Sequence, residues 1–144
     1  MQYTMTTVNF WPILIATIAA FLIGAVWYSW LFAKEWAELT GATAGNGQAS
    51  AGSGAKPGVW KSYVSQFVIT LIQFAVLGFL IAATGTVSGG DGAFFGFIVW
   101  LGFLATHAVS GMLWDRRPLK LILIESVGSL VSLIVGGAII GAWQ

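Results

Sequence analysis

Four long apolar runs constrain the fold of this chain more than any other feature of its sequence. They occupy approximately residues 10–32, 60–84, 93–114 and 119–143. A helix of about 20 apolar residues crosses the roughly 30 Å hydrocarbon core of a bilayer, and each run is long enough to do so. We therefore predict an all-α fold: an integral membrane four-helix bundle with four transmembrane spans in up-down-up-down order, forming one domain over residues 1–144.

The positions of the basic residues predict how the spans are oriented. All six lysines and arginines fall in two of the predicted loops or at the span ends next to them, as Lys34, Lys56 and Lys61 at one and Arg116, Arg117 and Lys120 at the other. Basic residues are enriched in cytoplasmic loops. We therefore expect both loops to be cytoplasmic and both chain termini to lie outside the cytoplasm.

Composition and motifs exclude several classes of function. The chain has no cysteine, which excludes disulfides, thiolate metal sites and cysteine catalysis. Its net charge of +1, without a dense basic cluster, gives no reason to expect a nucleic-acid partner. Residues 41–58 predict a flexible cytoplasmic loop, whose glycines lack the spacing of a phosphate-binding motif. Since no oxyanion-hole motif accompanies Ser110 and His107, we expect no enzymatic activity.

Two ionisable residues lie inside apolar runs, on either side of a short charged corner. His107 precedes Asp115 by eight residues and Glu125 follows Pro118 by seven. At about 1.5 Å per helical residue, each lies roughly 10–12 Å from the corner. Helices joined by so short a connection are neighbours. We therefore predict that His107 and Glu125 lie side by side, with Gln66 at a similar depth.

This predicted polar site is completed by two serines, Ser110 and Ser129. An inward face of the third run is predicted from residues spaced by three or four, namely Gly96, Trp100, Phe103, His107, Ser110 and Trp114. Three roles remain open for the site. It could fix helix packing by hydrogen bonds, relay protons or bind a cation in a channel or transporter, or place His107 as an axial ligand of a haem or chlorin. One histidine per chain permits a two-histidine site only across a dimer, and we expect no cofactor.

Small residues predict two faces for close helix packing. One comprises Ala16, Ala20 and Gly24, and the other Gly128, Ser132 and Gly136. Such stripes let helices approach closely in a membrane, either within one chain or between chains. At the charged corner, Arg116, Arg117 and Lys120 are candidates for contact with anionic lipid headgroups.

Two stretches resemble a known family. Residues 24–41, GAVWYSWLFAKEWAELTG, and residues 96–143, from GFIVWLGFLATHAVSGMLWDRRPLKLILIE onwards, resemble the bacterial membrane-protein family called domain of unknown function 1761. In that family a proline often follows the Trp-Tyr-Ser triplet, whereas Trp30 stands here, so we expect the first helix to continue further. The resemblance implies a four-span bacterial membrane protein and supplies no reaction or substrate.

From these observations we expect a small multi-pass protein of the bacterial inner membrane. It would act by association in the bilayer, as a homo-oligomer or as an accessory subunit of other membrane proteins. The alternative is a small channel or proton-coupled transporter that uses His107 and Glu125.

Overall fold

The computed structural model describes residues 8–40, 59–86 and 88–143. Its elements are α1 (Phe10–Val26), the π-helical segment η1 (Trp27–Leu31), α2 (Ala33–Thr40), α3 (Val59–Thr84), α4 (Gly89–Val99), the π-helical segment η2 (Trp100–Ala105), α5 (Thr106–Trp114) and α6 (Leu119–Ala142). Every regular element in this part of the chain is helical, so the all-α prediction is confirmed. The loop expected at residues 41–58 lies outside the described residues.

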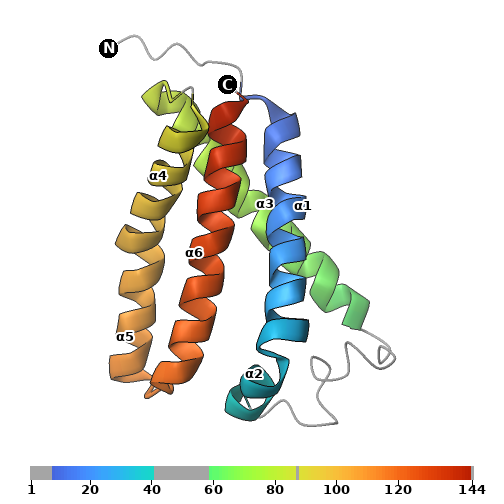
Figure 1. Ribbon diagram of the computed structural model, residues 1–144, viewed down its shortest axis with the longest axis vertical. Helices are drawn as coiled ribbons and strands as arrows, with labels where there is room; N and C mark the ends of the chain where they lie inside the picture. The colour runs from blue at the N-terminus through green and yellow to red at the C-terminus, as the bar shows by residue number, and fades with distance from the viewer. Residues whose placement is uncertain (1–7, 41–58, 87, 144) are drawn as a thin grey trace.

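Four helical stretches are long and apolar enough to cross a membrane. They are Phe10–Leu31, Trp60–Thr84, Gly89–Trp114 and Leu119–Ala142. The chain runs down α1, returns through α3, descends through α4 and α5 and rises again in α6 (Figure 1). The beginning of α1 and the end of α6 therefore lie at one end of the molecule, and α2 and the α5–α6 corner lie at the other.

The third spanning helix begins earlier than its hydropathy predicted. The predicted run starts at residue 93, but residues 89–92 already form the first turn of α4. Ser88 caps this helix, because its Oγ accepts a hydrogen bond from the backbone N–H of Asp91 at 3.1 Å and donates one to Asp91 Oδ2 at 2.7 Å. A hydroxyl cap satisfies a free N–H of the first turn, which compensates for the three glycines there.

The first spanning helix ends in a π-helical segment that the sequence did not predict. Its last turn widens into η1, where the N–H of Phe32 donates to the carbonyl of Trp27 at 3.0 Å. Phe32 then leaves the helical conformation, with φ −125° and ψ 21°. Helical structure therefore continues through Trp30 to Leu31, as expected from the missing proline, and the chain bends at Phe32 into the short helix α2.

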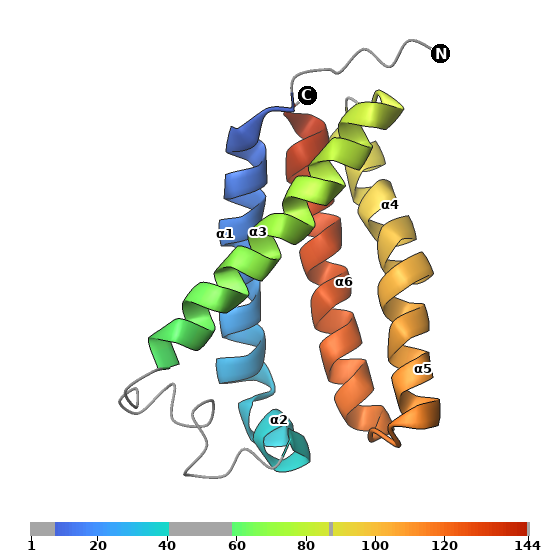
Figure 2. The same cartoon turned by 180° about the vertical axis from the view of Figure 1, so that it is seen from behind.

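The helix α6 is the centre of the molecule. It lies between α1 on one side and α4–α5 on the other (Figure 1), and α3 crosses α1 and α6 obliquely from behind (Figure 2). The buried core joins α1, α3 and α6 through Ile13, Ala16, Ala20, Phe74, Leu77, Ile81, Leu133 and Ile140. The other three spans therefore all pack against α6.

Glycines bring α4 and α6 into backbone contact. A methyl group on Gly92 would clash with the carbonyl oxygen of Gly137, and one on Gly96 would clash with that of Leu133. The reverse also holds, since a methyl group on Gly141 would lie 2.9 Å from the Cα of Gly92. Small residues at a helix crossing permit this approach.

Candidate functional site

Glu125 of α6 forms an ion pair with Arg117 of the α5–α6 corner. Arg117 Nη2 donates a hydrogen bond to Glu125 Oε2 at 2.7 Å. The two side chains remain 38% and 33% exposed. A carboxylate inside an apolar helix is costly unless it is neutralised or paired, and Arg117 supplies the counter-charge. This pair is the chemical centre of the site.

Trp27 of η1 fixes the helix backbone beside this carboxylate. Its indole Nε1 donates a hydrogen bond to the carbonyl oxygen of Ile124 at 2.9 Å. The ring lies on Gly128, where an added Cβ would be only 3.0 Å from the indole, and it packs against Phe32 with ring centroids 4.9 Å apart. A side chain at position 128 would therefore require the indole of Trp27 to shift by a few tenths of an ångström.

Trp100 of η2 makes the equivalent contact from the other side of α6. Its Nε1 donates to the carbonyl oxygen of Ser126 at 2.9 Å and to Ser129 Oγ at 3.1 Å. The carbonyls of the two residues that flank Glu125 are thus each bound by an indole from a different helix. Both tryptophans begin π-helical segments, a deviation that is frequent at functional sites.

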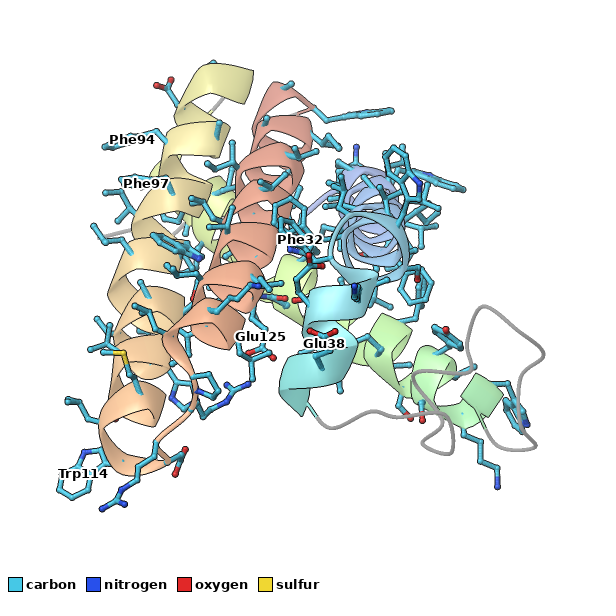
Figure 3. The ribbon with its side chains drawn as sticks, turned by 60° about the horizontal axis from the view of Figure 1, so that its bottom comes forward. Phe32, Glu38, Phe94, Phe97, Trp114 and Glu125 are labelled. Carbon is cyan, nitrogen blue, oxygen red and sulfur yellow. The ribbon has the colours of Figure 1, made fainter. Side chains whose placement is uncertain are left out.

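Tyr28 and the helix α2 also lie near the ion pair. Tyr28 follows Trp27 in η1 and lies within electrostatic range of both Glu125 and Arg117. The helix α2 contacts α6. Glu125 lies on the side of α6 toward α2, and Glu38 of α2 occupies the same region of the view (Figure 3).

The expected contact between His107 and Glu125 is not formed among the described residues. Glu125 is bound by Arg117, and the His107 side chain is exposed on α5. The cause is η2, because one extra residue in a helical turn rotates everything after it by about 100°. The inward stripe therefore shifts by one position.

The burial pattern of the third span shows this shift directly. Gly96 is buried and Trp100 packs against the core, as expected. From the second half of η2 onward the partly buried positions are Leu104, Ala105, Ala108, Gly111 and Met112, whereas the expected positions Phe103, His107, Ser110 and Trp114 are all exposed. Regular α-helical spacing predicted the wrong face for this half of the span.

The other residues of the predicted polar site are distributed over three helices. Ser129 lies at the site, where it accepts from Trp100 and donates to the carbonyl of Ser126 at 2.9 Å. Gln66 is exposed on α3, and its Nε2 donates to Thr70 Oγ1 at 3.3 Å on the same helix. Ser110 is exposed on α5. In the described part of the chain, no hydrogen bond links Gln66 or Ser110 to the ion pair.

The two predicted packing faces are used within the chain, with one exception. Ala16 and Ala20 are buried in the core, and a methyl group on Gly136 would clash with the ring of Phe74. Ser132 donates to the carbonyl of Gly128 at 3.0 Å in its own helix. Gly24 differs, because nothing lies within 4 Å of an added Cβ. The spacing of four residues predicted that Gly24 packs like Ala16 and Ala20, but this face of α1 no longer contacts the core at Gly24.

The three basic residues of the corner have different environments. Arg116 is exposed and adopts a positive φ of 52°, and Lys120 is exposed at the start of α6. Arg117 is turned back toward the membrane span by its pairing with Glu125. Contact of Arg116 and Lys120 with anionic headgroups stays a prediction, whereas Arg117 already has a carboxylate partner.

The site presents a carboxylate and a guanidinium at its exposed side. In the ranges that the structure describes, no three histidine, aspartate or glutamate side chains come close enough to hold a metal ion. Sequence reasoning missed Trp27, Tyr28 and Arg117 as parts of the site. The positions of Trp27 and Trp100 within their spans could have indicated the site, because an indole N–H away from the membrane interface needs a hydrogen-bond partner.

Comparison with known proteins supplies a family without a known activity. No curated protein and no solved structure matches the chain. The family model for "Protein of unknown function (DUF1761)" matches residues 11–141, which cover all four spanning helices except the first residue of the first and the last residue of the fourth, and include both Trp27 and Trp100. This chain belongs to that family.

Proposed function

We propose that this protein is an integral membrane subunit that acts by association, and that a second copy of the chain is its partner. The observation that carries this proposal is Gln73, an exposed amide in the middle of α3. It lies 13 residues after Trp60 and 11 before Thr84, the two ends of the span.

An amide at this position requires a hydrogen-bond partner if α3 spans a bilayer. Gln73 has none among the residues that the structure describes, whereas Gln66, seven residues earlier on the same side of α3, is satisfied by Thr70. Burying an unpaired amide in hydrocarbon costs several kcal/mol on the scale of about 4–8 kcal/mol for transfer to cyclohexane. The partner therefore has to come from another chain.

A second copy fits this requirement because a carboxamide is self-complementary. Each amide carries donors and an acceptor, so two glutamines related by a two-fold axis can exchange hydrogen bonds. The rest of this α3 surface is apolar and exposed, including Ile69, Ile72 and Val76. Apart from Gly24, the small-residue faces of α1 and α6 are occupied within the chain, so these two faces do not offer an alternative contact.

Transport has less support from the geometry. The alternative required His107 and Glu125 to act together, and these two residues do not meet. An oligomer could still enclose a path between subunits, and flux measurements on reconstituted Glu125→Gln protein test this directly.

The association is tested by measuring the dimerisation constant in bilayers with fluorescence energy transfer between labelled copies. Interhelical hydrogen bonds in membranes contribute about 0.6 kcal/mol on average and up to about 2, so Gln73→Leu should weaken dimerisation about three- to thirty-fold. Gln66→Leu is the matched control and should have a smaller effect, because its amide is satisfied within α3. A wild-type chain that stays monomeric, or a Gln73→Leu variant that dimerises as the wild type does, would overturn the proposal.

A further inference from the structure

Arg117 and Glu125 both keep groups that can form further hydrogen bonds, namely N–H donors on the guanidinium and an acceptor oxygen on the carboxylate. One hydrogen bond joins the two groups, from Nη2 to Oε2. A guanidinium carries five N–H donors and a carboxylate two acceptor oxygens. In the described residues no other partner binds the second carboxylate oxygen or the remaining donors, and both side chains are about one-third exposed. The pair therefore presents a cationic and an anionic group side by side on the molecular surface.

The site extends from the charged corner to a level just below the lipid headgroups. Leu119–Ala142 comprises 24 residues, or about 36 Å at 1.5 Å per residue, which exceeds the roughly 30 Å hydrocarbon core by a few ångströms at each end. Glu125 lies six residues, or about 9 Å, into this helix, so its backbone is about 6 Å inside the edge of the hydrocarbon core, and Arg117 reaches it from the corner. Trp30 and Trp114 are exposed at the same end of the molecule, as expected of interfacial anchors.

The backbone around the pair is held in place rather than mobile. Trp27 and Trp100 bind the carbonyls of Ile124 and Ser126, on both sides of Glu125. Gly128 lets the first of these rings lie directly on α6. A carboxylate positioned in this way loses little conformational freedom when a ligand binds, which favours recognition of a particular headgroup.

We propose that Arg117 and Glu125 together bind the headgroup of a phospholipid that carries a phosphate and a primary ammonium, as in phosphatidylethanolamine. The phosphate oxygens accept hydrogen bonds from the free donors of Arg117, and the ammonium donates to Oε1 of Glu125. This goes beyond association through α3, because it uses a different surface.

The two charges select this headgroup over the common alternatives. A choline headgroup has a phosphate but no N–H to donate to Glu125. A glycerol headgroup has no cation, so its phosphate would be repelled by the carboxylate that already neutralises Arg117. An ethanolamine headgroup satisfies both groups at once, since charge-assisted hydrogen bonds form on each side.

The test uses the full chain, purified in a mild detergent, with lipid binding measured by native mass spectrometry. Ethanolamine, choline and glycerol phospholipids with identical acyl chains serve as probes, together with water-soluble phosphoethanolamine. We expect the ethanolamine lipid to bind about five-fold more tightly than either other lipid, and phosphoethanolamine alone to bind far more weakly, since it lacks the acyl chains.

Variants separate the ion pair from the general basic charge of the corner. Glu125→Gln should reduce the preference for ethanolamine over choline to less than about two-fold. Arg116→Gln is the matched control and should keep the full preference, because Arg116 is exposed and lies outside the pair. Equal binding of the ethanolamine and choline lipids to the wild-type protein would overturn the proposal, whatever the variants do. So would an equal loss in Arg116→Gln.

Discussion

Replacing Gly96 by alanine tests whether backbone contact between α4 and α6 holds the molecule together. An added methyl carbon would lie 2.8 Å from the carbonyl carbon of Leu133 and closer still to its oxygen. Carbon atoms pack best at about 3.5–4.0 Å, so the two helices would have to separate by roughly 1 Å. Because the obstacle is backbone, no rotamer change can relieve it.

The expected cost follows from the loss of contacts along the whole crossing. A retreat of 0.5–1 Å forfeits about a quarter to a half of each van der Waals contact, and overpacking of this kind costs about 1–3 kcal/mol. The higher helix propensity of alanine returns at most about 1 kcal/mol. Gly96→Ala should therefore lower the free energy of unfolding by about 1–2 kcal/mol.

Unfolding in mixed micelles with increasing SDS, followed by tryptophan fluorescence, provides the measurement. Gly24→Ala is the matched control, because it makes the same change in a spanning helix where nothing lies within 4 Å of the new methyl group. Gly24→Ala should be neutral or slightly stabilising. Equal stability of the two variants would refute the argument that the glycines of α4 are there for close packing.

Three further predictions concern other parts of the molecule. Trp27→Phe keeps an aromatic ring but removes the hydrogen bond to Ile124, and should lower unfolding free energy in the same assay by about 0.5–1.5 kcal/mol. Arg116→Gly should raise it by about 1 kcal/mol, because a positive φ of 52° is unfavourable for arginine and free for glycine; no change would show that the corner is unstrained. The chain has no cysteine, so single cysteines at Asp115 and Trp143 can report sidedness. A membrane-impermeant maleimide applied to intact cells should label only the second, and labelling of the first would overturn the predicted orientation.

The sequence was sufficient to predict the number and type of the spanning elements. Length and continuous hydrophobicity determine whether a helix can cross a bilayer, and neither depends on how the helices pack. Spacing by three or four residues placed Gly96 and Trp100 on the inward face, and Gly96 is buried while Trp100 packs against the core. It also allowed for the possibility that the small-residue stripes pack within the chain, as Ala16, Ala20 and Gly136 do.

The partner of Glu125 could not be predicted from spacing alone. Arg117 lies eight residues before it in sequence, across a corner whose geometry depends on the left-handed conformation of Arg116. The start of α4 was misplaced for a related reason, since hydropathy does not register the hydrogen bonds of Ser88 that keep three glycines helical. In both cases the structure depends on a particular hydrogen bond, from Arg117 to Glu125 or from Asp91 to Ser88, which neither residue spacing nor hydropathy can predict.

The two π-helical segments account for the largest difference between the predicted and observed sites, and they also explain why the site exists. Each begins at a tryptophan that binds a backbone carbonyl of α6 next to Glu125. Because a π-helical turn adds a residue, it changes which face of the helix continues inward, so His107 is turned outward by η2 while Trp100 stays against α6. A regular α-helix here would have kept His107 on the same face as Trp100. The geometry that anchors the backbone around Glu125 therefore also removes the imidazole from it and leaves the carboxylate to Arg117.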